Sequence, residues 1–160
     1  MEIIIKKSTI KDFNELQILW EGQQKFHHHI DGLVYSSLNS SVKIKIFRYL
    51  KNILKNTRVN PMFVAKVNNE CVGFISFMID QYKYFDSNIK KRGFINEFYV
   101  SDNMRGKGIG RLLMKHTEEF LKKQKVDIIE VRVSIFNKRT VKLYKELGYK
   151  GLSLSFYKKL

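Results

Sequence analysis

Three glycines, each separated by one residue, follow an apolar run in the segment VSDNMRGKGIGR, residues 100–111. The preceding run GFINEFYV (residues 93–100) is typical of a buried strand, and Ile109, Leu113 and Phe120 recur at helical spacing after the glycines. This pattern predicts a strand, a glycine loop and a helix that begins near Ile109. Backbone N–H groups and the positive end of the helix dipole would meet in that loop, which favours an anionic ligand such as a pyrophosphate.

The spacing of the glycines separates this loop from two other nucleotide-binding motifs. A Rossmann fingerprint is G-x-G-x-x-G, whereas residues 106–110 give G-x-G-x-G and Arg111 stands where the third fingerprint glycine belongs. A Rossmann oxidoreductase would also use Glu130 as its acidic residue, but one βαβ unit cannot supply a second nucleotide-binding half. No Walker sequence G-x-x-x-x-G-K-[ST] occurs in the 160 residues. We therefore expect neither a dinucleotide oxidoreductase nor a nucleotide triphosphatase.

Length and composition predict one domain in a reducing compartment. The 160 residues, 44% of them hydrophobic, suffice for a single domain over residues 1–160 with a substantial core. Cys71 is the only cysteine, which excludes an intramolecular disulfide. The start MEIIIKK has too short an apolar run for a signal peptide, and no run approaches the roughly 18 residues of a membrane span. We therefore expect a cytoplasmic protein with no membrane partner.

The chain is strongly basic, with 30 Lys and Arg residues against 15 Asp and Glu and a net charge of +15. Such a charge brings anionic ligands and nucleic acid into consideration. The basic residues are spread through the chain, so we interpret most of them as a solvated surface and disfavour a nucleic-acid partner. The histidines at 27–29 would point in different directions on a helix and form a poor chelate, so we expect no metal site.

Hydrophobic spacing predicts a mixed sheet with helices on its faces. We expect the order β, α, α, β, β, β, α, β, α, β, in which Ser8 or Thr9 caps the first helix and Asn137 caps the last. The expected strands are residues 2–6, 62–67, 71–79, 93–100, 127–136 and 149–160. Four helices are expected: the first ends near residue 28, the second spans 42–54, the third spans 109–125, and the fourth runs from 138 to a terminal glycine at 148. Residues 81–92 are expected to be a loop or a ragged strand end.

Two segments resemble motifs of the GNAT superfamily of N-acetyltransferases. The segment FYVSDNMRGKGIGRLLM resembles the acetyl-CoA motif, a strand end followed by [RQ]-x-x-G-x-[GA], here Arg105, Gly108 and Gly110. About 32 residues further on, NKRTVKLYKELGY (residues 137–149) resembles N-x-x-A-x-x-[LF]-Y-x-x-x-G-[FY], with Thr140 in place of the alanine. The resemblance implies an α/β fold of the α+β type, with a mixed, mostly antiparallel central sheet of six to seven strands flanked by about four helices.

The resemblance also implies an activity and a cofactor. It points to an acetyl-CoA-dependent N-acetyltransferase that moves an acetyl group directly to a primary amine and leaves CoA as product. The acceptor would be a small-molecule amine or a protein amine, and a homodimer is common in the superfamily. The residues then expected to hold acetyl-CoA are Phe98, Tyr99, Val100, Arg105, Gly106, Lys107, Gly108, Ile109, Gly110, Arg111, Asn137, Arg139 and Tyr144.

Two further roles follow from the resemblance. Tyr144 corresponds to a tyrosine near the sulfur, where its phenol would be protonated at neutral pH and could act as general acid; the alternative is one aromatic of a core stripe. Relatives often use an acidic residue at the position of Glu97 as general base, frequently through a water, and the alternative is a structural ion pair. In a regular strand Glu97 faces away from Asn96 and Phe98, and a bulge would alter that. Asn137 would cap its helix and contact the pantetheine arm.

A second class of function stays open at this stage. A non-catalytic CoA-binding module, attached to an anionic partner such as RNA or the ribosome, would need the glycine loop as well. It would have no use for an acid near the sulfur, so Tyr144 and Glu97 discriminate between the two hypotheses. The acceptor pocket is expected around residues 20–35 and 81–85, which are aromatic and poor in acids, and the acceptor itself is not identified by these residues.

Overall fold

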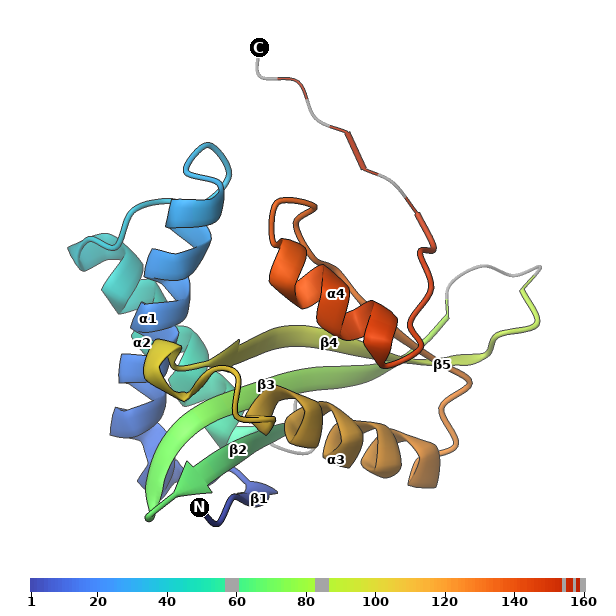
Figure 1. Cartoon of the computed structure of the whole chain (residues 1–160), viewed down its shortest axis with the longest axis horizontal. Helices are drawn as coiled ribbons and strands as arrows, with labels where there is room; N and C mark the ends of the chain where they lie inside the picture. The colour runs from blue at the N-terminus through green and yellow to red at the C-terminus, as the bar shows by residue number, and fades with distance from the viewer. Residues whose placement is uncertain (57–60, 83–86, 154, 157, 159–160) are drawn as a thin grey trace.

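The computed structural model describes residues 1–56, 61–82, 87–153, 155–156 and 158 of the chain. Within these described residues, five strands and four α-helices follow one another along the chain, and Figure 1 shows their arrangement. The strands are β1 (Ile4–Lys7), β2 (Met62–Val67), β3 (Glu70–Gln81), β4 (Lys91–Val100) and β5 (Ile128–Val131). The helices are α1 (Phe13–Ile30), α2 (Ser40–Lys55), α3 (Ile109–Lys123) and α4 (Lys138–Glu146), with short 3-10 turns at Ile10–Asp12 and Asp102–Met104.

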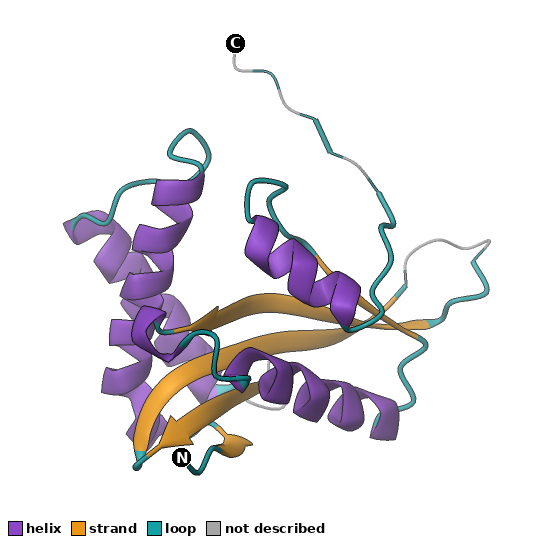
Figure 2. Cartoon of the chain, in the orientation of Figure 1, coloured by secondary structure: helices purple, strands orange, loops and turns teal. Residues whose placement is uncertain are grey.

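The strands form one sheet in the order β1-β2-β3-β4-β5. Neighbouring strands are antiparallel except for β4 and β5, which run parallel. Helices lie on both sides of this sheet, as Figure 2 shows. The predicted mixed, mostly antiparallel α/β architecture is therefore confirmed.

Two core clusters lie on the two faces of the sheet. One joins α1 and α2 to the sheet through Leu16, Leu50 and Phe74. The other joins α3 and α4 to the opposite face, where Ile75 packs among residues such as Leu113. The residues of β3 from 71 to 77 are all buried, because helices cover both of its faces.

Local sequence signals account for the helix starts. The Asn137 side chain accepts a hydrogen bond of 3.2 Å from the Thr140 N–H and caps α4, as expected. At the first helix the Thr9 N–H donates to Asp12 over 2.8 Å, and a 3-10 turn precedes the α-helical residues. Asn39 caps α2 by accepting from Val42 over 3.0 Å. A short polar side chain thus satisfies free N–H groups at each of these starts.

The predicted number of strands is wrong, because the described residues form five strands rather than six to seven. The strand expected at residues 127–136 ends at Val131, and the chain then turns toward α4 with Phe136 exposed. The expected last strand, 149–160, is absent from its described residues, in which Leu152 is 62% and Phe156 89% exposed. Alternation of apolar residues favours a strand only where a partner strand pairs with it.

The segment of residues 81–92 was expected to be a loop or a ragged strand end, and its two ends belong to strands. Both β3 and β4 extend into it, and Gln81 pairs with Lys91. An ion pair between Arg92 and Asp80, with N–O distances of 3.0 and 2.7 Å, stabilises this extension. Residues 83–86, part of the region expected near the acceptor, lie outside the described residues.

A buried polar cluster ties the start of α1 to the hairpin of β2 and β3. Lys66 Nζ lies 2.9 Å from Asp12 Oδ1 and 3.3 Å from Glu15 Oε1. The backbone N–H of Cys71 donates to Glu15. Burial, with the charge of Glu15, raises the pKa of the Cys71 thiol to about 12, so the thiol is protonated and unreactive at neutral pH.

None of the helices in the described part of the chain combines the length and the apolar character that crossing a bilayer would require.

Candidate active site

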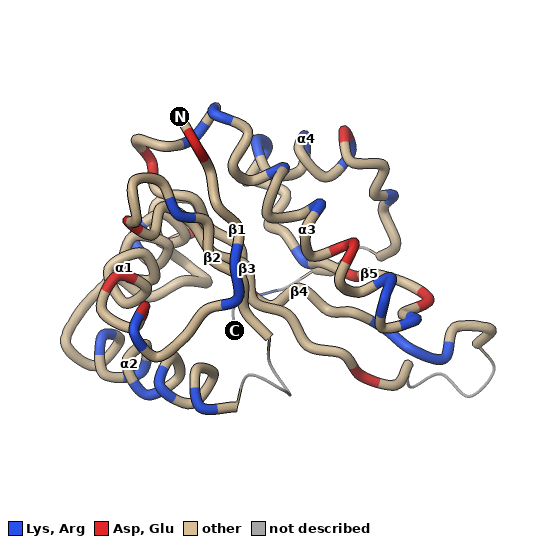
Figure 3. Tube along the Cα trace, turned by 90° about the horizontal axis from the view of Figure 1, so that it is seen from below, with Lys and Arg blue, Asp and Glu red and all other residues tan. Residues whose placement is uncertain are grey.

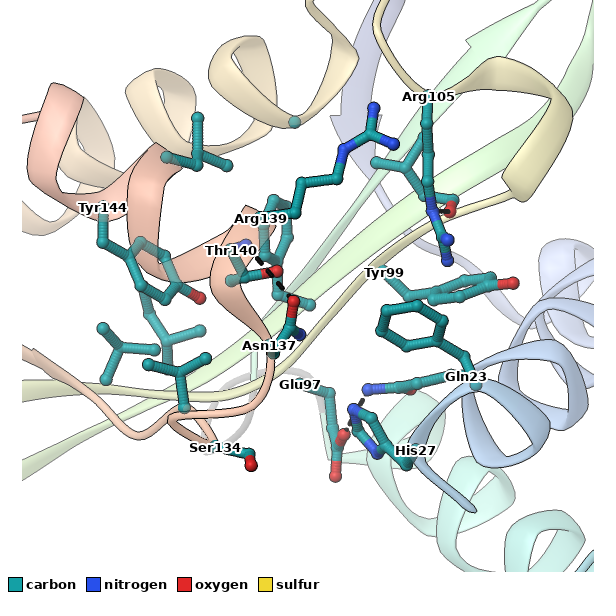
Figure 4. A pocket seen from close by; sticks show the side chains of 18 of the residues that line it. Gln23, His27, Glu97, Tyr99, Arg105, Ser134, Asn137, Arg139, Thr140 and Tyr144 are labelled. Carbon is teal, nitrogen blue, oxygen red and sulfur yellow. Dashed lines mark hydrogen bonds between the residues drawn. The ribbon is translucent and has the colours of Figure 1, made fainter. Parts of the chain in front are cut away.

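A cavity of about 930 Å³ lies between α1, the end of β4, the glycine loop and α4. Figure 4 shows its side chains, which come from segments far apart in the sequence. The predicted site residues that line it are Glu97, Phe98, Tyr99, Val100, Arg105, Gly106, Gly108, Ile109, Gly110, Arg111, Asn137, Arg139 and Tyr144. Lys107 is not among the lining residues, and its ammonium group contacts Met104 Sδ at 3.3 Å instead. The fold thus brings two distant motifs to one cavity.

The glycine loop borders this cavity with Gly106, Gly108 and the first residues of α3. Gly106 and Gly108 have φ angles of +82° and +81°, which L-residues with side chains rarely adopt. No described residue accepts a hydrogen bond from the N–H groups of residues 106–111, since the first helical bond of α3 runs from Leu112 to Gly108 over 3.1 Å. These groups and the start of α3 form a positive surface suited to an anion.

Close packing explains the third glycine. A Cβ atom on Gly110 would lie 3.0 Å from Phe98 Cζ, so a side chain there would push the β4 aromatic ring aside. A Cβ atom on Gly108 would meet nothing within 4 Å, so at that position the space is open. The loop therefore packs tightly against β4 at Gly110 and is accessible at Gly108.

Arg105 fixes the loop to the end of β4. Its Nε donates to the Val100 carbonyl over 3.0 Å, and its Nη2 lies 2.6 Å from Asp102 Oδ1. The guanidinium also covers the Phe26 ring at 4.3 Å and the Tyr99 ring at 5.2 Å from their centroids. The Arg105 guanidinium is thus already bound by other residues of the protein, and it positions the loop. The backbone of the loop supplies the free N–H groups.

The other two predicted arginines border the loop. Arg111 Nη2 forms an ion pair of 2.8 Å with Glu146 of α4. Arg139 lies beside Gly106, because a Cβ atom on that glycine would be 3.8 Å from Arg139 Nη2. Arg139 can therefore add a positive charge next to the free N–H groups.

A bulge in β4 decides where Glu97 points. Ser76 of β3 pairs with Glu97 and Phe77 pairs with Ile95, so Asn96 is an extra residue in β4. In a regular strand Ile95 and Glu97 would share a face. The bulge leaves Ile95 in the core against α3 and turns Glu97 toward α1. This agrees with the expectation from the sequence that a bulge would change the direction of Glu97.

Glu97 is partly buried, and its carboxyl group lies beside the Gln23 amide. Gln23 Nε2 of α1 donates to Glu97 Oε2 over 2.7 Å, and Gln23 itself is only 2% exposed. Burial raises the pKa of the Glu97 carboxyl to about 7, against the lowering effect of that hydrogen bond. Burial and the charge of Glu97 in turn raise the pKa of both Tyr35 and Tyr49. A carboxyl group near half-ionisation at neutral pH suits proton transfer.

Tyr144 faces the same cavity from α4. Its side chain is 6% exposed, and burial raises its pKa well above the usual value, so the phenol is protonated at neutral pH. No described residue is hydrogen-bonded to the Tyr144 hydroxyl, which points into the cavity in Figure 4. Glu97, Gln23 and His27 lie on the opposite side of the cavity, near α1. A proton donor and a proton acceptor thus border one cavity.

Sequence reasoning singled out none of three further residues of this site, although Gln23 and His27 lie in the segment 20–35 where it expected the acceptor pocket. Gln23 continues the buried stripe of Leu16 and Trp20 on α1, and a polar residue on a buried face was a usable signal. His27 lines the cavity, where burial lowers its pKa. Arg132 was hidden because it was taken as one residue of a longer strand.

Comparison with known proteins identifies the fold family. The sequence profile of the acetyltransferase (GNAT) family matches residues 17–149. The chain belongs to the GNAT acetyltransferase family. Both GNAT motifs seen in the sequence lie inside the matched range, as does the whole glycine loop.

Individual relatives agree with this family. An uncharacterised N-acetyltransferase of Methanocaldococcus jannaschii is 35% identical over 103 residues, which are 63% of this chain and 43% of that protein. The chain thus spans less than half the length of this curated GNAT relative. A crystal structure of a mutant BH1408 protein from Bacillus halodurans has a TM-score of 0.82 at 23% identity and covers 98% of this chain and 99% of its own.

A second solved structure shares the GNAT fold and contains a ligand. It is a predicted acetyltransferase with acetyl-CoA from Clostridium acetobutylicum, with a TM-score of 0.73 at 18% identity, and it covers 99% of this chain and 96% of its own. At this identity the likeness concerns the fold alone.

Proposed function

We propose that the protein is an acetyl-CoA-dependent N-acetyltransferase that transfers the acetyl group directly to a primary amine. The observation that carries this proposal is the arrangement around one cavity of the free N–H groups of residues 106–111, the Tyr144 hydroxyl and the Glu97 carboxyl. Membership of the GNAT family supports it. The proposal treats residues 1–160 as one catalytic domain and, because Cys71 is a lone thiol, favours a reducing compartment such as the cytoplasm.

The cavity fits the chemistry of acetyl-CoA. Its volume of about 930 Å³ is in the range of ligand pockets. The N–H groups of the glycine loop and the start of α3 would hold the pyrophosphate, and Arg139 beside Gly106 would add a positive charge. Past Ile95 no described strand pairs with β4 on its β5 side, so main-chain groups near Tyr99 and Val100 would be available to the pantetheine arm, apart from the Val100 carbonyl, which accepts from Arg105. Bound in this way, acetyl-CoA would supply the activated acetyl thioester.

The two titrating groups divide the proton transfers. As the C–N bond forms, Glu97 accepts the proton that the amine must lose, for which its pKa near 7 is suited. As the C–S bond breaks, the Tyr144 O–H donates its proton to the departing sulfur. The Gln23 amide holds the carboxylate of Glu97 in place through its 2.7 Å hydrogen bond.

A non-catalytic CoA-binding module is the second candidate. It would use the glycine loop but neither of the buried groups. Glu97 is partly buried and no described cation pairs with it, so its carboxyl has a raised pKa, for which a binding module has no need. We therefore favour the enzyme, with a small-molecule or protein amine as acceptor.

Replacement of Tyr144 by phenylalanine tests the proposal. We expect Tyr144→Phe to lower kcat about a hundredfold while the Kd for acetyl-CoA stays the same, because the phenol acts on the leaving group. Thiol release from acetyl-CoA with a panel of amines measures the rate, and calorimetry measures binding.

Tyr149→Phe is the matched control. The Tyr149 hydroxyl donates to Glu118 over 2.9 Å, and Tyr149 is not among the residues that line the cavity. We expect its turnover to equal that of the wild type. Wild-type turnover in Tyr144→Phe would remove Tyr144 from the mechanism.

A further inference from the structure

Arg132 lies on the same face of the sheet as Glu97, one strand away. β5 pairs with β4 so that Val131 is opposite Ile95, and both side chains belong to the cluster against α3. Side chains alternate along an extended chain, so Arg132 points to the other face. That is the face to which the bulge in β4 turns Glu97, and both residues line the cavity.

Neighbouring side chains hold Arg132 in place. Its guanidinium carbon lies 5.3 Å from the centroid of the Phe94 ring, and its Nε lies 3.6 Å from Glu130 Oε1. The other oxygen of Glu130 accepts a hydrogen bond of 2.7 Å from Arg92, which also binds Asp80 through two nitrogens. Glu130 is therefore engaged mainly by Arg92, and its contact with Arg132 is long.

The outer edge of the Arg132 guanidinium is accessible. Its side chain is 80% exposed, and no described residue accepts a hydrogen bond from its two Nη nitrogens. Two parallel N–H groups on a planar guanidinium match the two oxygens of a carboxylate or a phosphate. Stacking on Phe94 keeps this edge in a defined orientation at the cavity, which reduces the entropy lost on binding.

The acidic groups of the cavity leave little charge for a polycationic acceptor. Among the described residues that line it, the acidic side chains are Glu97 and Glu146. Glu146 already lies 2.8 Å from Arg111 and 3.9 Å from Lys142. Glu97 is required as the base. A polyamine would therefore find no free carboxylate for its additional ammonium groups.

We propose that the acceptor is an amine that also carries an anionic group, a carboxylate or a phosphate, and that Arg132 binds this group while the amine faces Glu97. This inference rests on the proposed N-acetyltransferase function. The ring of Phe94, which borders the same cavity beneath the guanidinium, would contact the apolar part of the acceptor.

Matched acceptors test this specificity. Beta-alanine and phenylalanine are each compared with their carboxamides as acceptors of acetyl-CoA, in wild type, Arg132→Gln and Arg48→Gln. Conversion of the carboxylate to a carboxamide also lowers the pKa of the amine. The rate with each acceptor is therefore compared between the wild type and the variants, and not between the carboxylate and its carboxamide. Arg48 is the matched control, because it is exposed on α2 and does not line the cavity.

We expect Arg132→Gln to lower kcat/KM about tenfold or more for the carboxylates, mainly through KM, and to leave the carboxamides unchanged. Arg48→Gln should change neither. Comparison of 2-aminoethylphosphonate with β-alanine, which has the same two-carbon spacer, identifies the anionic group, since the preferred acceptor will show the larger dependence of kcat/KM on Arg132. An equal loss for carboxylates and carboxamides would indicate a structural role and overturn the inference.

A binding measurement covers the case in which none of these amines is the natural acceptor. Phenylpropionate and its carboxamide are titrated into the protein saturated with CoA. Tighter binding of the carboxylate that is lost in Arg132→Gln supports the inference, and equal affinities overturn it. Acetylation of cationic or neutral amines alone would overturn the inference and leave the proposed function standing, whereas failure to bind acetyl-CoA would overturn the proposed function.

Discussion

Glu97 and Gln23 form the most informative pair of residues in the site. The carboxyl group is partly buried, and its one hydrogen bond within the described residues comes from the Gln23 amide at 2.7 Å. Burial disfavours the carboxylate, whereas the amide donor favours it. The pKa near 7 is the balance of these two effects, so it should respond to either residue.

We expect kcat/KM to rise with pH through about 7, because Glu97 must lose its proton to act as a base. Gln23→Leu removes the hydrogen bond that lowers this pKa. The inflection should therefore move to higher pH, by about one unit if the hydrogen bond contributes about 1.4 kcal/mol. The measurement is the pH dependence of thiol release under kcat/KM conditions.

Gln17→Leu on the same helix is the control, since Gln17 bonds to Glu21 over 3.3 Å and does not line the cavity. Among the described residues, Tyr35 and Tyr49 interact with the charge of Glu97, and His27 lies beside Glu97 in Figure 4, so His27→Asn is measured as well. An unchanged inflection in Gln23→Leu would show that Gln23 does not position the base.

At the scale of elements, α1 must be held firmly because it supplies Gln23. The cluster of Asp12, Lys66 and Glu15 joins the start of α1 to the β2–β3 hairpin. Burial alone would raise the pKa of Asp12, but hydrogen bonds from Lys66 and Thr9 hold it below its usual value. The carboxylate form of Asp12 therefore stabilises the folded state, and that stabilisation is lost as pH falls through the lowered pKa.

We expect Lys66→Met to lower the free energy of unfolding by about 3 kcal/mol at neutral pH, because it removes the cation 2.9 Å from the buried Asp12 and leaves that carboxylate with the longer contact of 3.9 Å to Lys6. Lys43→Met removes the more exposed contact of 3.5 Å to Glu21 and should cost less than about 1 kcal/mol. Urea unfolding of both variants provides the comparison. Equal losses of unfolding free energy in the two variants would contradict the view that the ion pair of Lys66 with Asp12 holds α1 to the hairpin.

Local sequence patterns predicted helices and helix caps better than they predicted the pairing of strands. The Asn137 cap and the helix beginning at Ile109 depend on a few adjacent residues, and both are found. The bulge at Asn96 depends on the register with β3, which no spacing within β4 reveals. The expected strand at 149–160 failed for a related reason, because alternation does not create a partner strand.

The residues of the site also fall into those that local sequence predicted and those that it did not. Motif spacing placed the glycine loop and Tyr144 at one cavity, since each motif carries its own local geometry. Gln23 and Arg132 came from segments outside both motifs, and only the packing of α1 and β5 against β4 brings them to Glu97.

Across the whole molecule, the positive charge is distributed rather than gathered. Figure 3 shows Lys and Arg on α2, along β1 and toward the far end of the sheet. A net charge of +15 spread in this way would attract anions such as the proposed acetyl-CoA from a distance, while the N–H groups of the glycine loop would supply the specific contacts. The absence of a nucleic-acid partner stays a prediction.

The most direct test of the account is calorimetric titration with acetyl-CoA, with NAD and ATP as control ligands, of wild type, Gly108→Val and Gly148→Val. Both glycines have positive φ, +81° and +88°, and an added Cβ atom would meet nothing within 4 Å at either position. The two substitutions therefore impose a similar backbone strain, but only Gly108 lines the cavity.

We predict selective binding of acetyl-CoA by the wild type and by Gly148→Val, and a loss of about tenfold or more in affinity for Gly108→Val, because its side chain blocks the approach of the pyrophosphate to the backbone. Equal affinities in the two variants, or no selective binding of acetyl-CoA by the wild type, would contradict the assignment of the glycine loop to the cofactor.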